Sequence, residues 1–123
     1  MAKKKILVVD DEESLRELVS TVLQEAGYDV AVAIDGKDCL ERLGKMRPDL
    51  ILLDMMMPGM SGREVCERIR KDPKISGLKV AFLTVAKFSE TGKDTLSKMK
   101  VLDYITKPFD NDDLVKRVRR MVG

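Results

Sequence analysis

Hydrophobic residues occur along the chain in five short runs, and stretches of mixed polarity separate each run from the next. The runs span Ile6–Val9, Val30–Ile34, Leu50–Leu53, Val80–Leu83 and Val101–Ile105. Three of the runs are almost wholly aliphatic, with little polar alternation. This pattern is typical of strands that are buried on both faces of a parallel sheet.

Helical periodicity appears in the stretches between and after these runs. The first stretch repeats apolar residues every three or four positions and then meets Gly27, which is typical of a helix end. A weakly anchored helix is expected between Ser89 and Lys100, where only Leu96 and Met99 are strong apolar anchors. The anchors of the other four helices are Leu15, Leu18, Val19, Val22, Leu23 and Ala26; Leu40, Leu43 and Met46; Val65, Cys66 and Ile69; and Leu114, Val115, Val118, Met121 and Val122.

Five strand–helix alternations without a linker or repeat predict a single α/β domain over residues 1–123, built on a parallel sheet. The crossovers should be right-handed. In such open sheets a ligand site lies outside the carboxyl ends of the strands.

Composition excludes several kinds of site. Because the chain contains no histidine, it lacks histidine triads and a side-chain phosphohistidine, and zinc binding is disfavoured. The net charge is only +2, which argues against direct nucleic-acid binding through bulk charge. Cys39 and Cys66 fall in helical patterns and are interpreted as reduced thiols. Neither a membrane-length apolar run nor a signal peptide is present, so we expect a cytoplasmic protein.

Polar side chains follow the predicted strands. Asp10 and Asp11 follow the first run and Asp54 the third, while Thr84 and Lys107 come after the fourth and fifth. Carboxylates brought together repel one another unless a cation lies between them, and an oxygen-only ligand set favours Mg²⁺. A metal, a lysine and a hydroxyl around a carboxylate nucleophile indicate phosphoryl transfer through an aspartyl phosphate.

Asp35 also follows a run, but there the preferred interpretation is a cap for the next helix. For Asp11, capping and ligation remain open.

Taken together, these stretches resemble the receiver domain of two-component response regulators. The matching segments are ILVVDDEESLRELV, PDLILLDMMMPGMSGREV, FLTVA and DYITKPF, in this order. The resemblance covers essentially the whole chain. It implies a flavodoxin-like, doubly wound sheet with strand order 2-1-3-4-5 and five helices, which leaves the strand before Asp35 at an edge.

The resemblance also implies roles for individual residues. Asp54 would be the phosphoacceptor, and Lys107 would pair with the phosphoryl group through a candidate cis Lys107–Pro108 bond. Thr84 would bond a phosphoryl oxygen, and Tyr104 would turn inward when Thr84 moves. The implied Mg²⁺ ligands are Asp11 directly, Asp10 mostly through water, Asp54, and the backbone carbonyl of Met56.

The implied function is a phosphorylation switch. A sensor histidine kinase, a phosphotransfer protein or a small phosphodonor would phosphorylate Asp54, and the surface of the fourth helix, fifth strand and fifth helix would change its affinity for a downstream protein. Only self-phosphorylation and slow self-dephosphorylation are expected, not separate enzymatic turnover. Because the sequence ends at Gly123, output is expected through another protein, from a monomer or a phosphorylation-dependent dimer.

Alternatives from other classes are weaker. A phosphorylation-independent interaction module on the same fold stays open, because Val85 stands where the family often has alanine or glycine. A phosphohydrolase would need an aspartate at the position of Met56, and a flavin carrier would not place four acids after its first strand.

Two other features depart from or extend the family pattern. The segment SKMKVLDYI lacks the Gly-Ala pair that is usual before the fifth strand, so the geometry of the loop near Asp103 is not predicted by the family pattern.

The loop after Asp54 carries Met55, Met56, Met57 and Met60. These methionines provide either adaptable packing or an apolar rim for a partner, and Pro58, Gly59 and Gly62 shape the return of the loop.

Overall fold

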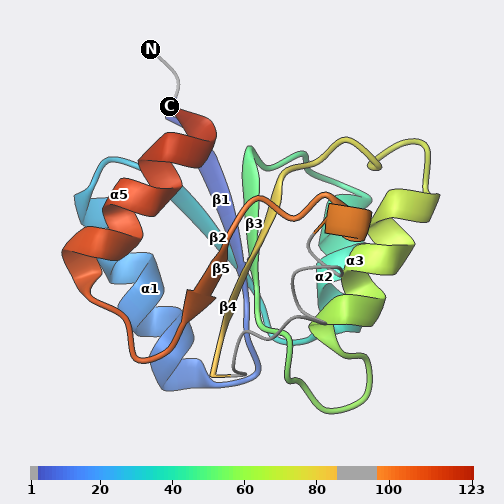
Figure 1. The fold of residues 1–123 in the computed structure, drawn as a ribbon, viewed down its shortest axis with the longest axis horizontal. Coiled ribbons are helices and arrows are strands. Elements are labelled where there is room, and N and C mark those ends of the chain that lie inside the picture. The colour runs from blue at the N-terminus through green and yellow to red at the C-terminus, as the bar shows by residue number, and fades with distance from the viewer. Residues whose placement is uncertain (1–2, 86–96) are drawn as a thin grey trace.

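The computed structural model describes residues 3–85 and 97–123, which form a parallel sheet covered on both faces by helices (Figure 1). The strands are β1 (Lys5–Val9), β2 (Asp29–Ala33), β3 (Leu50–Leu53), β4 (Val80–Thr84) and β5 (Tyr104–Thr106). The helices are α1 (Glu13–Glu25), α2 (Gly36–Leu43), α3 (Gly62–Lys71) and α5 (Asn111–Val122).

The strand order is β2-β1-β3-β4-β5, and every neighbouring pair is parallel, which confirms the predicted flavodoxin-like topology. Helices α1 and α5 lie on one face of the sheet and α2 and α3 on the other (Figure 1). Two apolar clusters follow from this layering: Val19 of α1 and Val118 of α5 belong to one, and Cys39 of α2 and Val65 of α3 to the other.

The three central strands are buried along nearly their whole length, as their aliphatic sequences predict. The edge strand β2 is only partly buried. It begins one residue earlier than predicted and ends before Ile34, which is exposed. Leu18 was predicted on the buried stripe of α1 and is instead largely exposed.

The fifth strand begins later than predicted, so Val101 and Leu102 lie outside it. The N–H of Leu102 donates to the carbonyl of Val80, whereas Phe82 lies opposite Tyr104. In a regular parallel ladder with that register, the N–H of Asp103 would bond to Val80. One extra residue is therefore inserted before β5, as in a bulge, and apolar content alone does not reveal such an insertion.

Two of the predicted helices also differ from those in the structure. The second helix ends at Leu43 with Gly44 as its cap, so Met46 lies beyond it. Of the helix expected between Ser89 and Lys100, residues 97–99 are helical and Met99 is buried, while residues 86–96, including Leu96, lie outside the described residues. Within the described part of the chain, no helix is long and apolar enough to cross a membrane.

Both cysteines are fully buried as free thiols, so we expect them to resist modification in the native protein. Burial, with a smaller contribution from the charge of Asp38, raises the pKa of the Cys39 thiol to about 12. The reactive thiolate is therefore scarce at pH 8. Ellman's reagent should label both thiols rapidly in guanidinium. Without guanidinium the labelling rate should be at least about tenfold lower, because labelling then requires opening of the core. Rapid labelling of the native protein would contradict this burial.

Candidate functional site

The carboxyl ends of β1 and β3 bring two aspartates together, as predicted. Val9 lies opposite Leu53 in the register, so Asp10 and Asp54 follow neighbouring strands at the same edge of the sheet. Both are buried, with 2% and 5% of their surfaces exposed. Asp11 is exposed but near: one carboxylate oxygen from each of Asp10, Asp11 and Asp54 lies within 4.8 Å of the others.

Asp35 does not join this group. Its side chain accepts a hydrogen bond from the Asp38 N–H at 2.8 Å and caps α2, as the sequence indicated. The residue before α1 is Glu12, which makes no side-chain cap, so the capping interpretation of Asp11 is wrong.

The ammonium of Lys107 reaches both buried carboxylates. Its Nζ lies 2.6 Å from Asp10 Oδ2 and 3.3 Å from Asp54 Oδ2. The Lys107–Pro108 peptide bond is cis, as the resemblance implied. The N–H of Lys107 donates to the Thr84 carbonyl at 2.9 Å, which ties the lysine to the end of β4. Lys107 thus supplies positive charge on one side of the acidic group.

Backbone N–H groups hold the other carboxylate oxygens. Glu12 N donates to Asp10 Oδ1 at 2.9 Å, and Met56 N donates to Asp54 Oδ1 at 3.0 Å. Both carboxylates are therefore fixed in orientation by contacts from their own loops. An oriented carboxylate with one oxygen beside an ammonium is suited to attack an electrophile held by that cation.

Burial raises the pKa of the Asp10 carboxyl, and the hydrogen bonds from Lys107 and from the Glu12 N–H oppose this shift. The charge of Asp54 raises the same pKa further. Lys107 also supplies one positive charge against three carboxylates, which leaves a deficit of positive charge in the acidic group. Together with the all-oxygen donor set, this deficit fits a hard divalent cation such as Mg²⁺, and the carboxylates of Asp10, Asp11 and Asp54 are the side chains that could hold it.

The loop after Asp54 returns sharply into α3, and glycine is required at the point of return. A Cβ on Gly62 would lie 2.2 Å from the Asp54 carbonyl oxygen. The Gly62 N–H also donates to the Met55 carbonyl at 3.0 Å. Gly59, within the loop, has a φ of 78°, in the left-handed region that glycine adopts without strain.

The methionines of this loop divide between the two interpretations. Met57 is buried, and Met55 and Met60 pack against the same cluster, which supports adaptable packing for these three. Met56 is 59% exposed. It lines a hollow of about 330 Å³ together with Asp10, Asp11, Glu12, Asp54, Val85 and Lys107. Val85 is 62% exposed, so the two apolar residues flank the opening above Asp54.

Thr84 and Tyr104 lie on the neighbouring strands β4 and β5. Thr84 is the last residue of β4 rather than the first after it, and it is fully buried. The Tyr104 ring packs edge-on against Phe82 with centroids 6.1 Å apart, and its hydroxyl lies 4.0 Å from Met55 Sδ. Burial and the charge of Asp54 raise the pKa of Tyr104. The sequence pattern did not reveal the Met55 contact.

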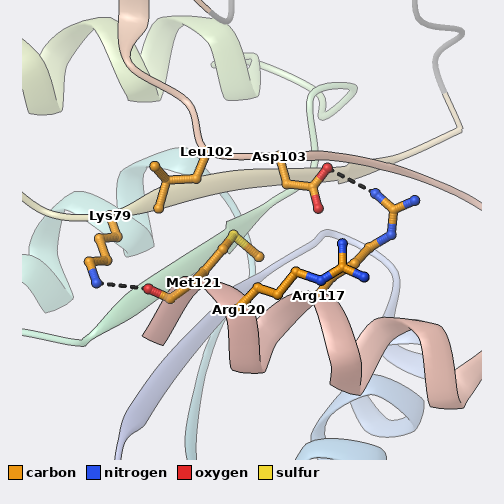
Figure 2. Close-up of a pocket in the computed structure, with 6 residues that line it drawn as sticks. All are labelled: Lys79, Leu102, Asp103, Arg117, Arg120 and Met121. Carbon is orange, nitrogen blue, oxygen red and sulfur yellow. Dashed lines mark hydrogen bonds and ion pairs between the residues drawn. The ribbon is translucent and has the colours of Figure 1, made fainter. Parts of the chain in front are cut away.

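A second hollow, of about 540 Å³, lies between α5 and the segment before β5 (Figure 2). Its lining is mainly basic and apolar: Lys79, Leu102, Asp103, Arg117, Arg120 and Met121. Arg117 Nη1 pairs with Asp103 Oδ1 at 2.9 Å, and Lys79 Nζ donates to the Met121 carbonyl at 2.7 Å (Figure 2). Since Lys79 precedes β4, this hollow lies toward the amino end of that strand, away from the acidic group.

Comparison with known sequences gives matches over most of the chain. Residues 6–119 match the family model described as response regulator receiver domain. The DNA-binding response regulator MtrA of Mycobacterium tuberculosis is 43% identical over 124 residues, covering 95% of this chain and 50% of MtrA. MtrA of Mycobacterium leprae gives the same identity and coverage. The chain thus spans about half the length of these curated relatives.

Solved structures agree over nearly the whole chain. Chemotaxis protein CheY4 of Vibrio cholerae superposes with a TM-score of 0.90 at 34% identity, covering 98% of this chain and 99% of that one. The response regulator TrrA of Thermotoga maritima, solved in complex with Mg²⁺ and BeF, has a TM-score of 0.81 at 38% identity, covering 96% and 98%.

Proposed function

The chain belongs to the response regulator receiver domain family of two-component signalling, and on that premise we propose that residues 1–123 form one receiver that is switched by phosphorylation of Asp54. One difference supports Asp54 over Asp10 as the acceptor: the Lys107 ammonium lies 2.6 Å from Asp10 Oδ2 but 3.3 Å from Asp54 Oδ2, so Asp10 is the more closely paired carboxylate. Asp54 is a buried carboxylate with one oxygen held by the Met56 N–H and the other 3.3 Å from the Lys107 ammonium. A nucleophile held in this way has its geometry set before the donor arrives.

The proposed reaction is a transfer from nitrogen to oxygen. An oxygen of Asp54 bonds to phosphorus as the P–N bond of a donor phosphohistidine breaks, and the departing imidazole keeps the electron pair and takes a proton from water. Lys107 pairs with the phosphoryl oxygens and offsets the charge that they bring. We expect self-phosphorylation and slow hydrolysis of the adduct, not turnover of separate substrates.

Asp10, Asp11 and Asp54, together with the Met56 carbonyl, are the groups we assign to Mg²⁺. When bound, the ion supplies positive charge that allows an anionic donor to approach the carboxylates. The donor's identity follows from the family: a sensor histidine kinase or a phosphotransfer protein.

We expect Mg²⁺ to raise the melting temperature, because it relieves repulsion among the three carboxylates. At a concentration ten times the dissociation constant, the gain is about 1.4 kcal/mol, or about 5 °C for a domain of this size. Differential scanning fluorimetry with and without EDTA measures the shift. Asp11→Asn should reduce the shift, while Asp29→Asn, on the edge strand, should retain it. An equal shift in Asp11→Asn would remove Asp11 from the ligand set.

Thr84 and Tyr104 are our candidates for reporting the new group. Thr84 is at the carboxyl end of β4, and Tyr104 is on the adjacent strand, with its hydroxyl near the acceptor loop at Met55. The proposed output surface includes the second hollow, between α5 and the segment before β5. Its lining carries three cations and one acid, so a downstream protein with an acidic contact segment fits it best.

The MtrA relatives are described as DNA-binding regulators, and this chain matches about half of their length. We assign no direct DNA contact to residues 1–123. Their net charge of +2 provides little of the phosphate attraction on which such binding depends.

Incubation with acetyl phosphate and Mg²⁺ tests the proposal. Intact-mass spectrometry should show the addition of one phosphoryl group, which alkali or hydroxylamine removes. EDTA should suppress the addition. If no adduct forms, and partner affinity is the same for wild type and Asp54→Ala, the phosphorylation-independent interaction module replaces this proposal. The exposed Val85 at the opening is the feature that favours that second candidate.

A further inference from the structure

The guanidinium of Arg70, near the end of α3, donates hydrogen bonds to four backbone carbonyls from two separate segments. Two belong to the loop before β4, at Ser76 (2.9 Å) and Leu78 (2.7 Å). The other two close the helical turn before β5, at Met99 (2.7 Å) and Lys100 (3.2 Å). The planar five-donor fork of arginine allows one side chain to do this. Arg70 therefore holds both segments against α3.

Lys100 has a backbone conformation that makes such a restraint necessary. Its φ is 56°, in the left-handed region, and it is the only residue other than glycine with a positive φ in the described ranges 3–85 and 97–123. This conformation is unfavourable for a residue with a Cβ, and it persists only where the surroundings impose it. The hydrogen bond from Arg70 to the Lys100 carbonyl is such an imposed contact.

The residues that follow Lys100 lead to the hollow beside α5 and then to strand β5. Leu102 and Asp103 line the hollow beside α5, and Tyr104 begins β5 after the inserted residue. At its other end, α3 starts at Gly62, in close contact with the Asp54 carbonyl. One ten-residue helix thus touches the acceptor loop at its first residue and the Lys100 turn through Arg70.

We propose that Arg70 is a positioning residue of the switch. By holding Lys100 in its left-handed conformation, Arg70 allows Leu102 and Asp103, in the lining of the second hollow, to respond when the Asp54 site is occupied. This inference rests on the proposed phosphorylation of Asp54 and deepens it. Arg70 itself touches neither the acidic group nor the reacting atoms in the proposed reaction. Its loss should spare binding at Asp54 and weaken the response at the hollow.

Amide spectra of the ¹⁵N-labelled protein, titrated with Mg²⁺ and beryllofluoride as the phosphoryl mimic, test this. Wild type should show shifts at Leu102 and Arg120. In Arg70→Met and Arg70→Lys, the beryllofluoride affinity should stay within about twofold, while the shifts at the hollow fall by at least half. Lysine should not substitute, because one ammonium cannot serve four carbonyls. Arg68→Met, an exposed change on the same helix, should resemble wild type.

Rescue by glycine separates positioning from general stability. Lys100→Gly removes the cost of the left-handed conformation, so it should restore the shifts at the hollow in either Arg70 variant. Lys98→Gly, two residues earlier in the helical turn, should not. Without beryllofluoride, amide exchange at Leu102 should be at least tenfold faster in Arg70→Met and unchanged at Leu7 in β1.

Wild-type shifts at the hollow in the Arg70 variants, or equal rescue by both glycines, would overturn the inference. Absence of any wild-type response to beryllofluoride would instead overturn the proposed function on which it rests. If Arg70→Met does not fold, Arg70→Lys and its Lys100→Gly double variant decide the outcome.

Discussion

Asp54→Asn is expected to lower incorporation of the acid-labile phosphoryl group at least about 1000-fold, the scale on which loss of a nucleophile reduces rates. The asparagine side chain has the same shape, and its oxygen can still accept the Met56 N–H that Asp54 Oδ1 accepts at 3.0 Å. The fold should therefore survive. What disappears is the anionic oxygen beside Lys107 that forms the new bond. Intact-mass spectrometry after acetyl phosphate treatment, with peptide mapping of any adduct, measures the effect.

Asp35→Asn is the matched control. This aspartate also follows a strand, but its side chain caps α2 and takes no part in the acidic group. Its replacement by asparagine, another good capping residue, should leave phosphorylation at the wild-type rate. A wild-type level of adduct in Asp54→Asn, mapped to Asp10 or Asp11, would move the acceptor and contradict the assignment.

Gly62→Ala is expected to lower the free energy of unfolding by about 3 kcal/mol, at the upper end of the usual range for overpacking. The added Cβ would lie 2.2 Å from the carbonyl oxygen of Asp54 and 2.7 Å from the Cα of Met55, and neither backbone atom can rotate away. Any relief must move α3 or the acceptor loop. Phosphorylation should therefore slow along with the loss of stability, which urea unfolding and the acetyl phosphate assay measure separately.

Gly77→Ala provides the comparison, because a Cβ there would meet nothing within 4 Å and the backbone has no positive φ. We expect its stability to stay within about 1 kcal/mol of wild type or to rise slightly, as the unfolded chain loses freedom. Similar losses in the two variants would mean that the contact at Gly62 does not restrict the loop.

Local patterns identified most of the residues of the candidate site. Asp10 and Asp54 directly follow buried aliphatic runs, but their meeting depends on β1 lying next to β3, and before the structure this adjacency came only from the family resemblance. Lys107 follows the next run but one, so its approach to the acids also depends on strand order, which came from the family resemblance. The start of β5 was misplaced, because Val101 and Leu102 are as apolar as strand residues while the ladder contains an extra residue.

The sequence alone therefore decided the α/β class, the buried strands and the candidate acids at the strand ends, because a run of apolar residues reflects burial one residue at a time. Only the tertiary structure revealed the hydrogen bonds from Arg70 to four backbone carbonyls and the left-handed conformation of Lys100. It alone also revealed the hollow where Lys79 meets the end of α5. These contacts join segments up to 42 residues apart in the sequence. The partners are mostly backbone carbonyls, which every residue carries and no side-chain pattern can mark.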